Sequence, residues 1–182
     1  MSFPALIGIT GRAGVGKDTL AHYLHIMFGY HRYALAQPIK EALNARFGWT
    51  LERWNDRAWK EAPSEQCGTG AAGQFSPRSW AQWLGTEVGR ELHGDDCWIR
   101  LMQREWEQVR RSVDGMVVSD IRFDNEAAAI RELGGVVVCV DRSAAQPIAP
   151  HKSERGVSAS QSMPRSQTIV RSLNSSPTPS TR

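Results

Sequence analysis

FPALIGITGRAGVGKDTLAHYLHIMF, residues 3–28, gives the strongest prediction about the fold, because an apolar run, a glycine-rich turn and an amphipathic segment follow one another there. Residues 3–10 are almost wholly apolar and predict a buried strand. Residues 17–28 place apolar side chains, including Leu20, Leu24 and Met27, at helical spacing and predict a helix. The sequence therefore predicts a strand, a tight turn and a helix in direct succession.

The turn between strand and helix has the composition of a phosphate-binding loop. Its glycines allow successive backbone N–H groups to point inward, and the helix N-terminus adds partial positive charge. Lys17 would bridge the β- and γ-phosphates of ATP and follow the charge that develops during transfer. We therefore predict a nucleotide-binding loop, with Lys17 also catalytic, made of Gly11-Arg12-Ala13-Gly14-Val15-Gly16-Lys17-Asp18-Thr19.

One residue departs from the common form of this loop. Asp18 stands where a serine or threonine hydroxyl usually holds Mg²⁺. A carboxylate is a good hard-oxygen ligand, so we expect Asp18 to bind the metal, with Thr19 as the alternative after a small change of register. The other interpretation is a glycine-rich turn that carries a lysine by chance, and the strand–loop–helix context disfavours it.

The remaining segments up to residue 142 alternate apolar runs with amphipathic stretches. This predicts an α/β fold, a P-loop NTPase-like three-layer α/β/α architecture with a mainly parallel sheet. Residues 62–75 are expected to form a loop, and Ser76 to cap the helix that follows. Further strands are expected at residues 33–36, 116–119 and 136–140, and further helices at residues 38–47, 77–92, 96–113 and 124–133.

A second acidic position follows a predicted strand. Asp120 lies at its carboxyl end, where ligands gather in open α/β sheets, and we expect it to act on Mg²⁺ or on the acceptor. Arg122 is two residues further on and is expected to reach phosphate. The alternative is an aspartate that caps the next helix, for which Asp124 is the better candidate.

The predicted helix at residues 77–92 carries the candidate acceptor site. Arg78, Gln82, Thr86 and Arg90 share one broad face, which offers guanidinium groups for a phosphate and polar groups for a base or sugar. Two glycines on this helix, four residues apart, would let a ligand or another backbone come close. The alternative, equally compatible with composition, is a solvated face of arginine–glutamate pairs. Lys40 and Lys60 are weaker candidates for a phosphate contact, because most lysines on predicted helices are solvated.

Composition and charge limit the classes of function. Hydrophobic residues make up 41% and charged ones 23%, as in ordinary globular domains, and no apolar run approaches the ~20 residues of a membrane span. The three cysteines lack metal-ligand spacing, and no signal peptide is evident, so we expect a cytoplasmic protein. Residues 143–182 hold five cationic side chains against one acidic one. The basicity thus belongs to the tail, and nucleic-acid binding by the folded domain is not expected.

Six segments, in the same order, resemble phage-type deoxynucleoside monophosphate kinases. They are residues 11–19 with their Lys-Asp-Thr ending, 34–40, 56–61, 76–90, 119–126 and 151–154. The resemblance covers residues 3–156 and implies a kinase domain at residues 1–156, with an acceptor-binding helical region at about residues 37–113. Ten of the last 40 residues are serine and five are proline, so we expect residues 157–182 to form a disordered tail.

The resemblance implies transfer of phosphate from ATP, with Mg²⁺, to a deoxynucleoside monophosphate. It also implies a homodimer, action in the host cytoplasm if the chain is phage-encoded, and a lid that carries Arg142 as a catalytic residue. The expected catalytic residues are Lys17, Asp120, Arg122 and Arg142, the metal ligands Asp18 and Asp120, and the acceptor ligands Lys40, Arg78, Gln82, Thr86 and Arg90. The alternatives are another small-molecule kinase such as a dephospho-coenzyme A kinase, an ATP-binding switch protein, or a nucleic-acid-binding module that uses the basic tail.

Overall fold

A five-stranded, all-parallel sheet organises the molecule, seen here in a computed structural model that describes residues 4–70, 73–141 and 170–171. The strand order is β2-β5-β1-β6-β7, so the strand that precedes the glycine-rich loop is central. Arg142 and the segment 151–154 lie outside the described residues. The strands are β1 (Leu6–Thr10), β2 (Tyr30–Tyr33), β5 (Gly115–Ile121), β6 (Val136–Asp141) and β7 (Val170–Arg171).

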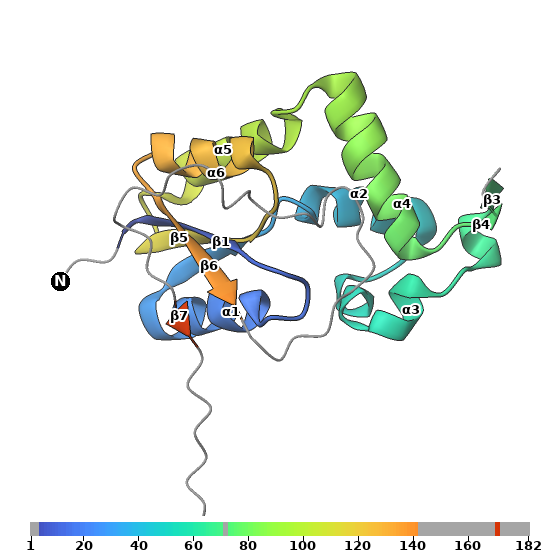
Figure 1. Ribbon diagram of the computed structural model, residues 1–182, viewed down its shortest axis with the longest axis horizontal. Helices are drawn as coiled ribbons and strands as arrows, with labels where there is room; N and C mark the ends of the chain where they lie inside the picture. Colours follow the sequence, from blue (N-terminus) through green and yellow to red (C-terminus); the bar gives the residue numbers. More distant parts are fainter. Residues whose placement is uncertain (1–3, 71–72, 142–169, 172–182) are drawn as a thin grey trace, which may run out of the picture.

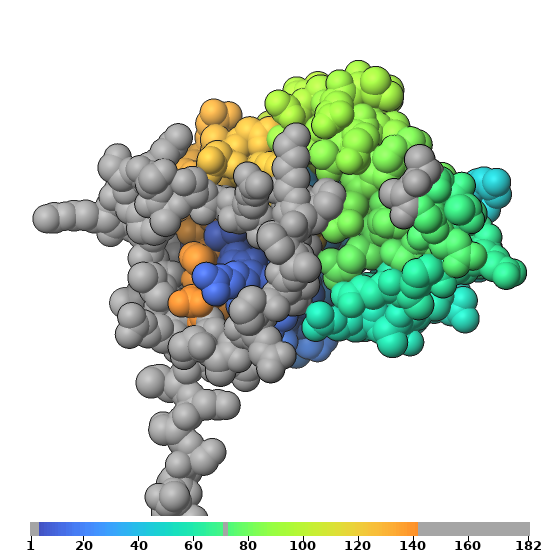
Figure 2. Space-filling view, turned by 45° about the vertical axis from the view of Figure 1, so that its right-hand side comes forward, coloured from blue at the N-terminus to red at the C-terminus, as the bar shows by residue number. Residues whose placement is uncertain are grey.

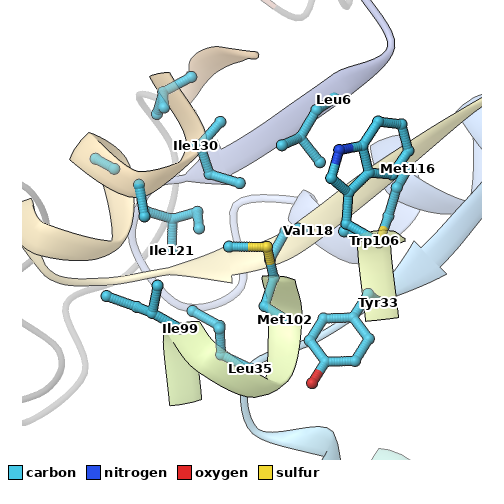
Figure 3. Close-up of a cluster of buried hydrophobic side chains, with 13 residues drawn as sticks. Leu6, Tyr33, Leu35, Ile99, Met102, Trp106, Met116, Val118, Ile121 and Ile130 are labelled. Carbon is cyan, nitrogen blue, oxygen red and sulfur yellow. The ribbon is translucent and has the colours of Figure 1, made fainter. Parts of the chain in front are cut away.

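Helices cover both faces of this sheet, which confirms the predicted three-layer α/β fold (Figure 1). Alternate residues of β1 face opposite layers: Leu6 packs in the cluster formed with α5 and α6, whereas Ile7 and Ile9 pack against α1. Figure 3 shows the first of these clusters, in which Met102 and Ile130 meet the strands. The covering helices are α1 (Lys17–Phe28), α5 (Cys97–Val109) and α6 (Asp124–Glu132).

Helix α1 has the bounds expected from sequence, and its ends explain why. Gly16 and Gly29 flank it with left-handed backbone conformations, at φ values of 103° and 67°. The Gly29 N–H donates to carbonyls of the last turn and ends the helix, so that β2 begins at Tyr30. The strand predicted at residues 33–36 was therefore placed three residues too late. Met27, one of the apolar residues at helical spacing, is 59% exposed.

A helical lobe, residues 37–92, stands beside the sheet (Figure 1), and its teal and green part forms one side of the space-filling view (Figure 2). Aromatic rings fill it: Trp49 stacks on Phe47 and meets Trp54 and Trp59 edge-on, so these tryptophans are core residues. The stretch expected to be a loop contains a short helix and a two-stranded hairpin. The elements of the lobe are α2 (Gln37–Phe47), η1 (Leu51–Asn55), α3 (Arg57–Glu61), η2 (Glu65–Cys67), β3 (Thr69–Gly70), β4 (Gly73–Gln74), α4 (Pro77–Trp83) and η3 (Leu84–Leu92).

The helix expected at residues 77–92 changes from an α-helix to a π-helix midway. Ser76 caps its start, as predicted, by accepting a hydrogen bond from the Ser79 N–H. After seven α-helical residues it continues as the π-helix η3, a form that often marks functional sites. The Trp98 indole N–H donates to the Gly85 carbonyl at 2.8 Å, and its ring packs so tightly on Gly89 that a Cβ there would collide with it. The close approach expected at these glycines is thus made by a side chain of α5.

Of the tail expected to be disordered, the structure describes Val170–Arg171, which pair with Val140 and Asp141 of β6 as strand β7. No helix among residues 4–70 and 73–141 combines the length and the apolar character that crossing a membrane requires.

Candidate active site

A pocket of about 470 Å³ lies between the carboxyl ends of β1 and β5 and the helical lobe. This is the edge at which open parallel sheets bind ligands. Seven of its lining side chains are cationic and three are acidic, so it is suited to anions. The cationic ones are Lys17, Lys40, Arg57, Lys60, Arg78, Arg90 and Arg122, and the acidic ones Asp18, Asp120 and Glu126.

The glycine-rich loop forms one end of this pocket. Gly14 and Gly16 have φ values of 78° and 103°, which only glycine adopts readily, and a Cβ on Gly11 would collide with the Val140 carbonyl oxygen. Lys17 folds over the loop, and its Nζ donates to the carbonyl oxygens of Gly11 at 2.7 Å and Arg12 at 2.8 Å. The loop is therefore preformed by backbone geometry, with the lysine held against it.

The two acidic groups predicted to act on the metal differ in their surroundings. Asp18 is exposed and lines the pocket, whereas Thr19 is exposed and is not among the lining residues. Asp120 also lines the pocket, but its two carboxylate oxygens accept the backbone N–H groups of Leu35 at 2.7 Å and Ala36 at 2.9 Å. Asp120 thus ties the end of β5 to the turn that leads from β2 into α2.

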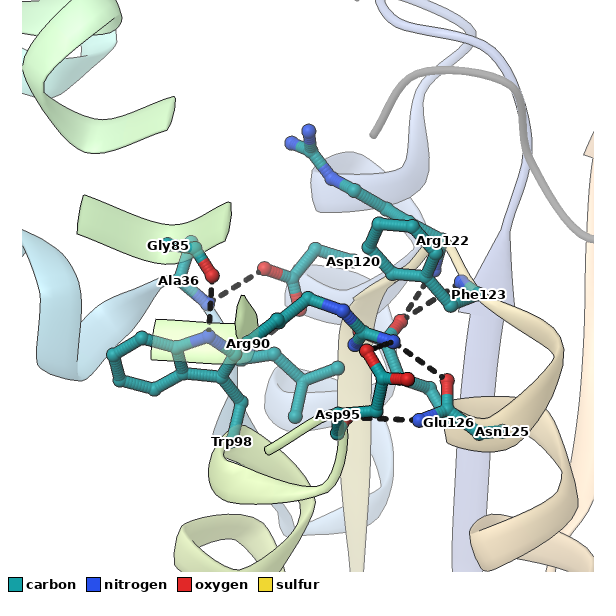
Figure 4. Close-up of polar contacts among 11 residues, drawn as sticks. Ala36, Gly85, Arg90, Asp95, Trp98, Asp120, Arg122, Phe123, Asn125 and Glu126 are labelled. Atoms are coloured by element: carbon teal, nitrogen blue, oxygen red, sulfur yellow. Dashed lines mark hydrogen bonds and ion pairs between the residues drawn. The ribbon is translucent and has the colours of Figure 1, made fainter. Parts of the chain in front are cut away.

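Glu126, a residue that the sequence analysis did not single out, organises the turn after β5 (Figure 4). It is 4% exposed, and its Oε2 accepts the backbone N–H groups of Arg122 at 2.7 Å and Phe123 at 3.0 Å. The start of α6 is thus capped by Glu126 and not by Asp124. Burial raises the pKa of Glu126 to about 7, against the lowering effect of these two backbone hydrogen bonds.

The candidate acceptor residues predicted from sequence all line the pocket. Arg78 pairs with Glu61 at 3.5 Å, and Thr86 is buried on the wall. Arg90 does not pair with the neighbouring glutamates of its own helix, because its guanidinium contacts Glu126 at 3.4 Å and Asp95 at 3.3 Å. The structure therefore brings together Lys40, Arg78, Gln82, Thr86 and Arg90 with the glycine-rich loop.

Lys60 is less exposed than the solvated lysine that was expected. It is half-buried, lines the pocket, and its Nζ donates to the Trp54 carbonyl at 3.2 Å. Burial lowers its pKa, and the positive charges of Arg78 and Lys40 lower it further. The helix that carries it, α3, is only five residues long and shows no period from which the burial of this side chain could be predicted.

Comparisons with known proteins agree on one family. The family profile described as deoxynucleotide monophosphate kinase matches residues 5–61 and 64–172, which extends beyond the kinase boundary predicted at residue 156. A protein of Acanthamoeba polyphaga mimivirus, described as a putative deoxynucleotide monophosphate kinase, is 31% identical over 82% of this chain and 80% of its own. The deoxynucleoside-5'-monophosphate kinase of Escherichia phage T5 is 25% identical over 70% of this chain and 72% of its own.

A solved structure is also similar, though weakly. The crystal structure of TT1252 from Thermus thermophilus has a TM-score of 0.35 and 22% identity over 76% of this chain and 65% of that chain, slightly under two thirds. The family profile alone matches most of the sequence, and the first relative is more than 30% identical over most of both chains. The chain therefore belongs to the deoxynucleotide monophosphate kinase family, as the sequence predicted.

Proposed function

We propose that this protein transfers the γ-phosphoryl group of ATP to a deoxynucleoside monophosphate, giving ADP and a deoxynucleoside diphosphate. The observation that carries the proposal is one continuous pocket, with a phosphate-binding loop at one end and a cluster of cationic side chains at the other. Two phosphate-bearing molecules can meet in such a pocket end to end. Membership of the family supports the same reaction.

The donor side of the reaction belongs to the glycine-rich loop. Its backbone N–H groups and the start of α1 would receive the β-phosphate of ATP. Lys17 would leave the two loop carbonyls that it contacts and follow the charge on the transferred group. The movement that we propose is a rotation of the Lys17 side chain away from these two carbonyls.

The acceptor side belongs to Lys40, Lys60 and Arg78. These three cations come from α2, α3 and α4 and lie close enough for two of them to lower the pKa of the third. Like charges that are partly buried together repel one another, and a phosphate dianion would relieve that repulsion. We therefore propose that they bind the phosphate of the acceptor, with Gln82 and Thr86 close to its sugar or base.

Mg²⁺ fits the residues present in the manner usual for kinases, which hold it by one or two carboxylates and by substrate phosphates. Asp18 offers an exposed carboxylate at the loop, and each Asp120 oxygen keeps a lone pair beyond its one N–H contact. Among the described residues no group of three or more histidine, cysteine or acidic side chains forms a ready-made metal site. The ion would neutralise phosphate charge, and Asp18 with Asp120 would hold it.

Phosphoryl transfer requires no further catalytic group, such as a general base, from the protein. An oxygen of the acceptor phosphate attacks the γ-phosphorus while the bond to the β-phosphate oxygen breaks, and that oxygen leaves with ADP. The attacking oxygen belongs to a phosphate dianion, so no side chain has to remove a proton. Positioning and positive charge supply the acceleration, with Arg122 as a further cation that lines the pocket.

The test is ADP formation from Mg-ATP in the presence of each of the four deoxynucleoside monophosphates, with dephospho-coenzyme A as a control acceptor. We expect turnover that depends on at least one monophosphate. Lys17→Ala should lower kcat about a hundredfold or more, whereas Arg110→Ala, an exposed arginine outside the pocket, should not change it. ATP hydrolysis that no monophosphate stimulates would contradict the proposal and favour a switch protein.

A further inference from the structure

The surroundings of Arg90 are unusual for a residue that binds substrate. Its side chain is only 9% exposed, and its guanidinium contacts three acceptors on two other segments. These are Glu126 Oε1 at 3.4 Å, Asn125 Oδ1 at 3.2 Å and Asp95 Oδ1 at 3.3 Å. The plane of the guanidinium also lies over the ring of Phe123, with its carbon 3.9 Å from the ring centre. Its hydrogen-bonding capacity is thus directed at the protein itself.

Glu126 completes this arrangement from the other side. One carboxylate oxygen fixes the backbone of Arg122 and Phe123, and the other contacts Arg90 (Figure 4). A buried carboxylate is costly unless it is paired, and here it is paired with a cation from a different element. Glu126 therefore links η3, which forms one wall of the pocket, to the turn between β5 and α6.

The linked segments carry groups on which the proposed reaction depends. The turn after β5 carries Arg122, whose side chain extends away from the network in Figure 4 and lines the pocket. The helix formed by α4 and η3 carries Arg78, Gln82 and Thr86. A displacement of one segment relative to the other would misalign donor and acceptor. A misplacement of ~1 Å can cost about a hundredfold in rate.

We infer that Arg90 and Glu126 act as a strut, an ion pair that holds two segments at a fixed relative position. The segments are the β5–α6 turn and the acceptor wall, by which we mean the side of the pocket formed by the lobe helices α2, α3, α4 and η3. In this arrangement Arg90 does not bind the acceptor phosphate. This inference rests on the proposed function and reassigns a residue that the sequence marked as an acceptor ligand. Both are positioning residues, because their contacts are with protein groups. Asn125 belongs to the same link, since its Nδ2 donates to the Asp95 carbonyl at 2.8 Å.

The experiment compares four variants with wild type in steady-state kinetics for both substrates. Arg90→Met removes the guanidinium and keeps an apolar stem, Glu126→Gln removes the charge and keeps the shape, and the double variant removes both. Arg90→Lys keeps the positive charge, but an ammonium cannot reproduce a planar group with three partners on an aromatic ring. The matched control is Arg100→Met, whose exposed pair with Asp96 at 2.6 Å lies on α5 outside the pocket.

The strut predicts that Arg90→Met and Glu126→Gln each lower kcat about tenfold to a hundredfold and leave the KM for ATP within about twofold of wild type. The double variant should be no slower than the worse single variant, and Arg90→Lys should not restore the rate. Arg100→Met should match wild type.

A direct role in phosphate binding predicts a different pattern. In that case Arg90→Met raises the KM for the monophosphate, Arg90→Lys partly restores it, and Glu126→Gln resembles wild type. That pattern would overturn the inference, and so would wild-type kinetics in the two single variants.

Failure of the proposed function can be distinguished from failure of the strut, because the two are tested by different measurements. A wild-type protein without acceptor-dependent ADP formation would refute the reaction but leave the strut testable, because the strut also predicts coupled stability. Urea unfolding of wild type, the two single variants and the double variant should show that the losses in unfolding free energy caused by Arg90→Met and Glu126→Gln are not additive. Additive losses would overturn the strut whatever the reaction is.

Discussion

The two ends of the pocket are built in different ways. The loop at residues 11–18 is one continuous segment, shaped by glycine backbone conformations and by a lysine that contacts its own loop. The opposite wall gathers side chains from α2, α3, α4 and η3, and its key contacts join residues far apart in sequence, such as Arg90 with Glu126 and Asp120 with Leu35. A loop of the first kind needs the right local sequence, whereas a wall of the second kind also needs the fold around it.

The largest effect expected at the loop comes from Gly11→Ala. The new Cβ would collide with the Val140 carbonyl oxygen, at a φ of 141° that disfavours any other residue. We expect a loss of about 3 kcal/mol or more in unfolding free energy, together with loss of ATP binding. Urea unfolding and calorimetric titration with ATP would measure the two effects.

Gly48→Ala is the matched control for this substitution. Its φ is also positive, at 70°, but nothing lies within 4 Å of the position of a new Cβ. We expect about 1 kcal/mol of destabilisation and normal ATP binding. Equal losses of unfolding free energy in the two variants would mean that the close approach of Gly11 to the Val140 carbonyl of β6 does not limit which residue fits at position 11.

The acceptor wall should respond to pH through Glu126. Its pKa in the folded protein is about 7, against an ordinary value of 4.5, so the folded state binds this proton more tightly than the unfolded chain does. This contribution to stability is complete below pH 4.5 and is lost as the pH rises through 7. Relative to Glu126→Gln, the wild type should lose up to about 3 kcal/mol of unfolding free energy across that range. A difference that does not vary with pH would show that burial does not raise the pKa of this carboxyl.

A smaller effect is expected from Lys60→Met. Removing one of the three clustered cations should raise the KM for the monophosphate about tenfold and leave the KM for ATP unchanged. Arg53→Met is a suitable control, because this exposed arginine packs over the Trp59 ring and is not among the residues that line the pocket. An increase in the KM for ATP alone would indicate that Lys60 contacts ATP and not the monophosphate.

The smallest effect is expected from Asp18→Ser. A hydroxyl is the usual magnesium ligand after the loop lysine, so this exchange should keep kcat within about tenfold of wild type. Asp18→Ala offers no oxygen and should lower kcat more, with a partial recovery at high Mg²⁺ concentration. If both variants keep the wild-type rate, Asp18 does not hold the metal.

Much of the donor end could be predicted from sequence, because its determinants are local. The spacing of Gly11, Gly16 and Lys17 between a strand and a helix is enough to place the loop, and the apolar run before Asp120 places it at the same edge of the sheet. The cap at Ser76 could be predicted for the same reason, since its partner is three residues away.

The acceptor wall could be predicted only in part. Lys60 lies on a helix too short to show a period, and its burial depends on the aromatic cluster around Trp54. Glu126 looks like an ordinary residue in the first turn of a helix, and its burial depends on Arg90, 36 positions earlier. Residues whose role is set by such packing carry no signal in one sequence.

In the proposed reaction, donor and acceptor occupy one continuous pocket. The most direct test is inhibition by a bisubstrate compound, in which adenosine and a deoxynucleoside accepted in the kinase assay are joined by five phosphates. A single pocket predicts that it competes with ATP and with the monophosphate, and binds more tightly than either. Competition with one substrate only would contradict a single pocket for donor and acceptor, because the two phosphate sites would then not lie end to end.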